Sequence, residues 1–288
     1  MALTTATAPA PLRRRHRISA ASPFIYFVAL VVIGLTVTPI LYVIFGGFRT
    51  NSQLIVSPDG FPSPWVFSNY QRVLTSPDFW TEVGNSAIAG LTTTAGVIIL
   101  GVMAAFVIAR FQFRGREALY TVFTLGLLFP LTVAVLPLYL LLQNTGLLGT
   151  LAGVIIPQVA FALPVTIIIL VPFLRAIPDE LEDAAAIDGT GRFGFFWRIM
   201  LPLSGPGLVT VGVLAFVNSW NSFLLPLIVL SDQSTYTLPL GVQNFSTAYS
   251  QDTAAVLAFT ALSMLPAMIF FTLAERRIVG GLTGAVKG

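Results

Sequence analysis

The sequence predicts an all-α membrane protein with six transmembrane helices, and three observations lead to that prediction. Of its 288 residues, 56% are hydrophobic and only 9% are charged, whereas about a quarter of the residues in a typical soluble domain are charged. The apolar residues gather in six blocks, each longer than the ~20 residues that cross a bilayer as a helix. No block contains Asp, Glu, Lys, Arg or His. Because a soluble fold needs more polar surface to cover its core, a soluble globular protein is excluded.

The six blocks are the expected helices in chain order. They are Phe24–Phe48, Gly84–Ala109, Ala118–Leu142, Leu151–Leu174, Gly207–Leu230 and Ala254–Ala274. The first is too long for the apolar region of a cleaved signal peptide and has no small-residue cleavage site after it, so we expect it to stay as a signal anchor. Prolines inside the blocks are tolerated in membrane helices, because neighbouring spans satisfy the freed backbone groups. One membrane domain (23–278) is expected between a disordered basic N-terminal tail (1–22) and a C-terminal tail (279–288).

The basic residues predict the orientation, because loops on the cytoplasmic side of a membrane collect Lys and Arg. With the N-terminus inside, thirteen of the 15 Lys and Arg residues fall in cytoplasmic segments, and only Arg49 and Arg72 fall outside. Both termini are therefore expected in the cytoplasm. This distribution also accounts for the net charge of +3, so no nucleic acid is expected as a partner. With no cysteine and a single histidine, His16, in the basic tail, no metal site is expected.

An acidic segment, residues 175–203, joins the fourth and fifth blocks and holds five of the 12 acidic residues. Pro178 suits the first position of a helix, and the carboxylates that follow it suit the positive end of the helix dipole. Gly189 suits the residue just past a helix end, where a left-handed backbone is common. We therefore expect a helix over about Pro178–Asp188. Four of its positions share one face with small side chains that permit close approach: Leu181, Ala184, Ala185 and Asp188.

A second short helix is expected directly after the first. Its apolar face would hold Phe193, Phe196, Trp197 and Met200, and Pro202 would end it before the fifth block. Such a pair could simply rest on the membrane surface as amphipathic helices. The carboxylate cluster argues against that alternative, because lipids of the inner leaflet are anionic and would repel it. A partner other than lipid is therefore expected at this segment.

Residues 175–203 resemble the EAA loop of ATP-binding-cassette (ABC) importer permeases, the cytoplasmic element that docks into the ATPase subunit. The likeness rests on a carboxylate and two small residues, then Asp-Gly, an aromatic residue and a Leu-Pro-Leu run. Asp183 stands where the family usually has Glu. The resemblance implies an ATPase-coupling role for Asp183, Ala184, Ala185, Asp188, Gly189, Phe193 and Phe196.

The resemblance covers nearly the whole hydrophobic part of the chain. It is strongest to the carbohydrate-uptake permeases of the maltose type, specifically the smaller six-span partner. Four stretches carry it: 111–116, 144–150, 216–227 and 281–288. It implies a type I ABC importer permease fold in a bacterial plasma membrane, with this chain as half of a translocation pore. It also implies a second homologous permease chain, two ATPase subunits and an extracytoplasmic solute-binding protein.

The residues themselves restrict the substrate and the energy source. The chain has no GxxxxGK[ST] phosphate loop, so we expect no ATP site, no cofactor and no enzymatic activity in this chain, and ATP would be bound by the ATPase partners. Spans without ionisable groups argue against proton or sodium coupling and against a strongly charged substrate. A neutral sugar or oligosaccharide fits, although another neutral polar solute or, with less support, a secondary carrier stays open. A membrane-embedded lipid transferase would need further carboxylates for metal, which the stretch after Asp188-Gly189 lacks.

The candidate substrate path lies in the fifth block. Asn218 and Asn221 are three residues apart, so on a continuous helix they would share one face and could offer amides to sugar hydroxyls. The alternative is that they hydrogen-bond between neighbouring spans. Trp220, on the same turn, points elsewhere, and packing or an interface role suits it better than sugar stacking. The sequence does not identify the sugar.

Overall fold

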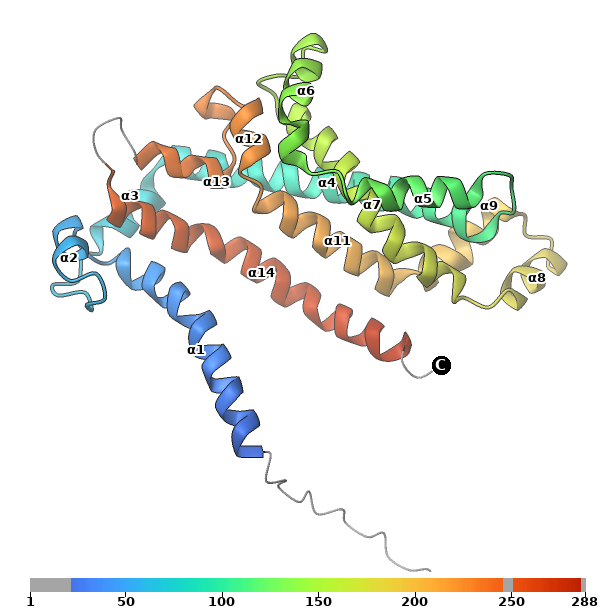
Figure 1. Ribbon diagram of the computed structural model, residues 1–288, viewed down its shortest axis with the longest axis horizontal. Helices are drawn as coiled ribbons and strands as arrows, with labels where there is room; N and C mark the ends of the chain where they lie inside the picture. The colour runs from blue at the N-terminus through green and yellow to red at the C-terminus, as the bar shows by residue number, and fades with distance from the viewer. Residues whose placement is uncertain (1–21, 246–250, 286–288) are drawn as a thin grey trace, which may run out of the picture. The chain divides into compact units, whose positions relative to one another are not determined.

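The computed structural model describes residues 22–245 and 251–285, and within these ranges every regular element is a helix (Figure 1). The elements are α1 (Ser22–Gly46), α2 (Asn51–Val56), α3 (Ser68–Thr75), α4 (Pro77–Arg110), α5 (Arg116–Gly126), α6 (Leu131–Asn144), α7 (Leu151–Arg175), α8 (Glu180–Ile187), α9 (Arg192–Phe195), a π-helical turn (Phe196–Met200), α10 (Leu201–Leu203), α11 (Gly205–Trp220), α12 (Leu224–Val229), α13 (Leu238–Gly241), two 3₁₀ turns (Gln233–Thr235 and Val242–Phe245) and α14 (Thr253–Ala285). The predicted tail of residues 1–22 lies outside the described residues except for Ser22, and α14 continues past the predicted domain boundary at residue 279.

The chain divides into two compact units, Met1–Tyr42 and Val43–Gly288. The described part of the first unit is the larger part of α1, an apolar helix of 25 residues whose length suits a span. It coincides with the first predicted block. All packing described below belongs to the second unit.

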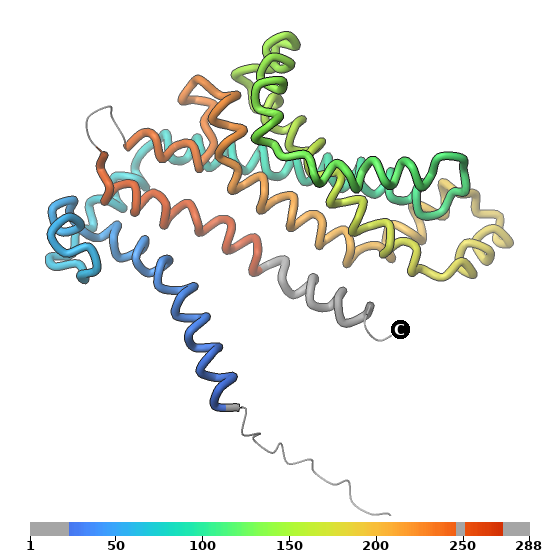
Figure 2. The backbone as a smooth tube through the Cα atoms, viewed as in Figure 1, coloured from blue at the N-terminus to red at the C-terminus, as the bar shows by residue number. Residues whose placement is uncertain are grey.

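Three helices, α4, α7 and α11, form the centre of the second unit (Figure 2). Small residues let their backbones approach closely, as is common between membrane helices. A Cβ added at Gly101 of α4 would lie 2.4 Å from the Cγ2 atom of Thr166 on α7, so only glycine fits at that contact. Around it lies the largest buried apolar cluster, whose members include Val102, Ile108, Ile167 and Leu170. This rigid centre holds both parts of the candidate site described below.

The second, fourth and sixth predicted blocks are each contained in one long helix, namely α4, α7 and α14. In the part of the chain that the structure describes, four helices are long and apolar enough to cross a membrane, or six if each of two bent pairs counts as one span. The third block spans one of these bent pairs, and the fifth block begins in the second helix of the other pair, α11. Both blocks differ from the continuous helices that the sequence predicted.

The third block, Ala118–Leu142, is broken between α5 and α6, which meet at 99°. The break is at Pro130, which caps α6 with extended backbone angles of φ −76° and ψ 135°. A proline disfavours helical backbone at the residue before it and supplies no N–H to the preceding turn. Pro130 therefore ends a helix here, whereas the sequence analysis treated it as tolerated inside one.

The fifth block, Gly207–Leu230, is also interrupted. α11 ends at Trp220, Asn221 is its C-cap residue, and α12 begins only at Leu224. Pro226 lies in the first turn of α12, where its missing N–H costs nothing. Continuing α11 through this proline would instead cost a backbone hydrogen bond.

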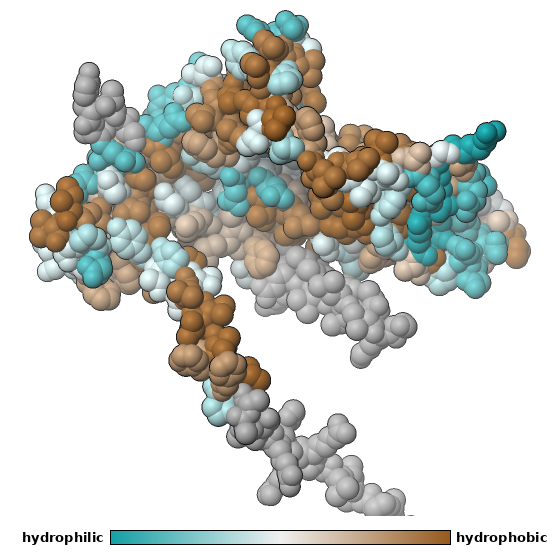
Figure 3. All heavy atoms as spheres, viewed as in Figure 1, coloured by the Kyte–Doolittle hydropathy of each residue, from teal (hydrophilic) through white to brown (hydrophobic). Residues whose placement is uncertain are grey.

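The two ends of the second unit differ in polarity. Figure 3 shows apolar side chains over much of the middle and hydrophilic residues gathered at the end that carries α8. At that end the buried guanidinium of Arg110 donates to the Leu174 carbonyl over 2.9 Å and pairs with Asp179. The start of the acidic segment is thereby fixed to the ends of α4 and α7.

At the opposite end, the segment before α14 is joined to the α2–α3 region. Asp252 forms an ion pair with Arg72 at 2.9 Å and accepts a hydrogen bond from the Asn51 amide at 3.0 Å. Burial raises the pKa of Asp252, but hydrogen bonds from the Ala255 N–H and Asn51, together with the charge of Arg72, outweigh burial and hold that pKa below its usual value. These contacts fix the start of α14.

Candidate functional site

The first part of the candidate site is the acidic segment that contains α8. The helix runs over Glu180–Ile187, so it begins two residues later than the predicted Pro178. Gly189 has a φ of +74°, which confirms the predicted left-handed residue. The Gly189 N–H donates to the Ala186 carbonyl at 3.0 Å, and the Thr190 N–H donates to the Ala185 carbonyl at 2.8 Å. This pair of bonds is a Schellman motif, which closes the helix and turns the chain toward α9.

The predicted strip of small residues on α8 does not lie on one exposed face. Ala185 is buried in the cluster that also contains Phe195 and Met200, so the helix uses this side to pack on its own core. Leu181, Ala184 and Asp188 are exposed, and Ile187 is 87% exposed. The sequence could not show that Ala184 is exposed and Ala185 buried, because the side of α8 that meets the core depends on tertiary packing. Leu181, Ala184, Ile187 and Asp188, together with the exposed Asp183, form what we call the α8 surface.

The second predicted short helix is one nearly continuous helical segment from α9 through α10. Three of the four residues predicted for its apolar face, Phe193, Phe196 and Trp197, line one apolar slot together. Phe193 is 78% and Trp197 52% exposed at this slot, whereas Met200 is buried in the core and departs from the predicted face. The cause is the π-helical turn, in which the Leu201 N–H donates to the Phe196 carbonyl five residues earlier. A π turn rotates each residue by less than an α turn does, so residues spaced for one α-helical face diverge. The segment ends at Leu203, one residue past the predicted Pro202, and the chain bends by 73° between Leu203 and Gly205 into α11, before the fifth block begins.

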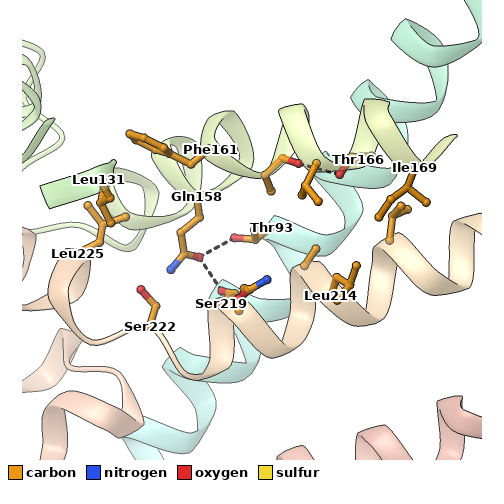
Figure 4. Close-up of a pocket in the computed structure, with 15 residues that line it drawn as sticks. Thr93, Leu131, Gln158, Phe161, Thr166, Ile169, Leu214, Ser219, Ser222 and Leu225 are labelled. Atoms are coloured by element: carbon orange, nitrogen blue, oxygen red, sulfur yellow. Dashed lines mark hydrogen bonds between the residues drawn. The ribbon is translucent and has the colours of Figure 1, made fainter. Parts of the chain in front are cut away.

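The second part of the candidate site is a cavity of about 200 Å³ between α4, α7 and α11. At its wall, the Gln158 Oε1 atom accepts hydrogen bonds from the hydroxyls of Thr93 at 3.0 Å and Ser219 at 2.6 Å (Figure 4). These three residues come from α7, α4 and α11, so the amide ties together the three central helices. The hydroxyls are buried and therefore need this acceptor.

The Gln158 Nε2 atom is buried and has no hydrogen-bond partner among the described residues. In Figure 4 it points toward the side of the cavity where Ser222 lies. An amide nitrogen offers two donors, and leaving a buried donor unpaired costs about 1–3 kcal/mol. A ligand with a hydroxyl acceptor would satisfy this group.

The two predicted asparagines line different cavities. Asn218 lines the cavity with Gln158 and Ser222, whereas Asn221, at the end of α11, lines a separate cavity of about 270 Å³ with Trp220. The prediction that they line one path is therefore wrong: the Asn221 N–H still donates to the Val217 carbonyl at 3.0 Å, but the two amides border different cavities. Trp220 is 4% exposed, lies 5.6 Å from the Phe216 ring in a stacked arrangement and donates its Nε1–H to the Ser263 carbonyl at 3.3 Å. It serves in packing, as the sequence analysis favoured.

Sequence reasoning missed Gln158 and Thr93. Gln158 was detectable, because it is the only amide side chain in the block Leu151–Leu174, and strongly polar side chains within a span face the protein interior or a pathway. Thr93 gave no such signal. It lies among other threonines of α4, and only the folded structure shows which of their side chains points toward Gln158.

A family model described as "Binding-protein-dependent transport system inner membrane component" matches residues 97–280, which include α8, Gln158 and Asn218. The chain belongs to this family. It is thus a membrane component of a transport system, and the predicted importer permease is confirmed at that level. Its relatives are transporter permeases rather than enzymes, so the lipid transferase has no support.

Several similar proteins are named for sugar uptake. The chain is 36% identical to the diacetylchitobiose uptake system permease protein NgcG of Streptomyces coelicolor, over 86% of this chain and 83% of that protein. It is 35% identical to the trehalose transport system permease protein SugB of Mycobacterium tuberculosis, over 90% and 95% of the two chains. A permease protein of the arabinooligosaccharides transport system, AraQ of Halalkalibacterium halodurans, is 32% identical over 92% and 94%.

Solved structures share the fold. A chain from the crystal structure of a bacterial ABC transporter involved in the import of the acidic polysaccharide alginate superposes with a TM-score of 0.76 at 20% identity, covering 91% of this chain and 99% of that one. A chain from inward-facing conformations of the MetNI methionine ABC transporter gives 0.55 at 15% identity, covering 72% and 99%. The predicted type I ABC importer permease fold is confirmed.

Proposed function

We propose that this chain is one of two permease subunits of an ABC importer for a neutral sugar or oligosaccharide. The observation that carries the proposal is the cavity between α4, α7 and α11, whose lining holds amide and hydroxyl groups and no charged side chain. Such groups pair with the hydroxyls of a neutral carbohydrate and offer nothing to compensate a charge. Its relatives named for diacetylchitobiose, trehalose and arabinooligosaccharides support the same substrate class. Another neutral polar solute remains the alternative.

Asn218 supports a second permease chain as partner. Its side chain is exposed on α11, beside the exposed Leu214, within a helix whose composition is that of a membrane span. An amide facing lipid is unfavourable, so polar groups in spans generally face protein or a water-filled pathway. A homologous permease covering this face would convert the open cavity into a closed pathway. Gln158 and Asn218 are then the proposed substrate contacts, while Asn221 and Trp220 lie outside this cavity.

The α8 surface is the proposed docking site for an ATPase subunit. It projects from the end of the unit, it carries exposed apolar side chains at Leu181 and Ile187, and the Schellman turn at Gly189 fixes its direction. Phe196 is buried, so it contributes by packing the α9 segment against α4. Ala185 is also buried and packs α8 against the core. Two ATPase subunits would bind ATP, and this chain would need no cofactor. A solute-binding protein would deliver the sugar on the opposite side.

The proposed orientation places α8 and both chain termini in the cytoplasm of a bacterial cell. Because the chain contains no cysteine, a single engineered cysteine reports topology cleanly. Gly191 is exposed, and a Cβ there meets no atom within 4 Å, so Gly191→Cys is expected to fold normally. It should resist a membrane-impermeant maleimide in intact cells and react once the membrane is opened. An Asp59→Cys variant in the opposite end region is the matched control and should react in intact cells. Labelling of residue 191 from outside would contradict the orientation.

The proposed division of labour is tested by reconstitution. The purified chain alone is expected to hydrolyse no ATP and to transport nothing, whereas the chain with its partner permease, ATPase subunits and binding protein should take up sugar in an ATP-dependent manner. A panel of neutral sugars, a sugar acid and a neutral amino acid measures the substrate class. ATP-independent uptake by the isolated chain would indicate a secondary carrier, and a preference for the sugar acid would contradict the neutral cavity.

A further inference from the structure

An apolar slot of about 300 Å³ lies where the end of α4 meets the α9 segment. Its lining is almost entirely apolar and comprises Met103, Phe106, Val107, Phe111, Phe193, Phe196, Trp197 and the stem of Arg192. The slot is distinct from the sugar cavity and from the α8 surface, since it shares no lining residue with either. A water-filled apolar slot of this size would be unfavourable, so an apolar occupant is expected.

The slot continues the surface of α4 that would face lipid. Ile99, Met103 and Val107 recur every four residues, lie on one side of α4 and are each more than 40% exposed. The slot opens at the end of this stripe, within two turns of Arg110, where α4 ends. Trp197 at its rim is 52% exposed, and tryptophan is enriched where hydrocarbon meets headgroups. The slot therefore lies at the depth of an acyl chain's upper part.

One charged side chain, Arg192, lines the slot, and carboxylates lie in the cleft beside it. The Arg192 guanidinium lies 4.8 Å from the centroid of the Phe111 ring, and among the described residues no carboxylate oxygen lies within 4.0 Å of it. Arg192 also lines the adjoining polar cleft, whose other charged members are Arg110, Asp179, Glu182 and Asp183. Arg110 pairs with Asp179, which leaves Arg192 beside the carboxylates of Glu182 and Asp183.

We propose that this slot binds a zwitterionic phospholipid of the inner leaflet. One acyl chain fills the apolar lining, the phosphate binds the Arg192 guanidinium and the headgroup amine faces Glu182 in the adjoining cleft. A guanidinium can bind phosphate oxygens through two N–H donors. The carboxylates disfavour a lipid of net negative charge, so a phosphatidylethanolamine is preferred over a phosphatidylglycerol. The inference rests on the proposed orientation for its choice of leaflet. It also explains why Phe193 is 78% exposed at a point where the chain meets the membrane.

Quenching of tryptophan fluorescence tests the proposal, because Trp197 lies at the slot. The full-length chain in detergent is titrated with brominated phosphatidylethanolamine or brominated phosphatidylglycerol, and the contribution of Trp197 is the difference from a Trp197→Phe variant. We expect the ethanolamine lipid to quench Trp197 at the lower concentration. Arg192→Gln should weaken this binding tenfold or more, because it removes the charge-assisted hydrogen bonds to the phosphate. Val107→Phe, which fills the slot, should abolish it.

Two matched variants serve as controls. Arg198→Gln removes an exposed arginine of the same segment that does not line the slot, and Ile99→Phe enlarges a residue of the same α4 stripe that lies one turn before Met103 and outside the slot lining. Both should bind lipid like the unaltered chain. Equal effects of Arg192→Gln and Arg198→Gln, equal or stronger quenching by phosphatidylglycerol, or no quenching of Trp197 would overturn the proposal. So would loss of ATPase co-purification in Val107→Phe with lipid binding unchanged, which would show that a protein side chain fills the slot. None of these measurements requires transport, so they stay separate from failure of the proposed function.

Discussion

Replacing Gly189 by valine is expected to uncouple the ATPase subunits from this chain and to reduce sugar uptake by tenfold or more. Gly189 has a φ of +74°, and a residue with a Cβ costs about 1–2 kcal/mol in the left-handed region, with a β-branched side chain among the worst. A Cβ at this position meets no atom within 4 Å, so the backbone is the only source of strain. Relief of that strain would break the Schellman motif and redirect α8 relative to α9.

Two variants isolate this cause. Gly189→Asn should retain most activity, because asparagine tolerates the left-handed conformation. Gly191→Val adds the same side chain two residues later, where the backbone is extended (φ −69°, ψ 168°) and a Cβ again meets nothing, so it should behave nearly as the unaltered chain. The measurements are co-purification of the ATPase subunits and ATP-driven uptake in vesicles. Normal association and uptake in Gly189→Val would mean that the α8 surface does not dock an ATPase.

The contrast between α8 and the α9 segment shows which local features the sequence reveals. The end of α8 was predictable because a left-handed residue is a local backbone requirement that glycine meets at lowest cost. The direction of Met200 in the second segment was not, because the π-helical turn at Phe196–Met200 changes the rotation of side chains, and no residue type marks such a turn. Packing on the core then decided that Ala185 faces inward and Ala184 outward.

Hydropathy likewise located the membrane blocks and failed to show where they bend. Pro130 and Pro226 both lie in apolar runs, and a membrane helix can pass through a proline or end at it, depending on whether neighbouring groups satisfy the freed carbonyl. Here both positions accompany breaks. The end of α11 is the region with functional consequences, because Asn218 and Asn221 line separate cavities there although helical spacing had paired them.

That separation leads to the second large effect, which concerns Gln158 and Asn218. Replacing Asn218 by leucine is expected to lower sugar uptake about fivefold with normal assembly, since a lost neutral hydrogen bond is worth about 1 kcal/mol and no intramolecular hydrogen bond of this side chain occurs among the described residues. Asn221→Leu removes the same amide from the neighbouring cavity and should have a clearly smaller effect. Uptake is measured against sugar concentration in vesicles that contain equal amounts of assembled importer.

Gln158 is expected to matter more than Asn218, and its two amide atoms act separately. The Oε1 atom holds Thr93 and Ser219, so Gln158→Leu leaves two buried hydroxyls without their acceptor, costing about 1–3 kcal/mol for each unsatisfied group. That variant should lose both stability and transport.

The triple variant Thr93→Val, Gln158→Leu, Ser219→Ala removes all three partners together and should recover stability. Replacing a whole hydrogen-bonded set by apolar groups is far less costly than leaving part of the set without its partners. If the Nε2 donor contacts sugar, uptake stays at least tenfold reduced in the triple variant while its thermal stability and assembly return. Recovery of uptake together with stability would assign Gln158 to helix packing alone and would leave Asn218 as the only amide proposed for the sugar path.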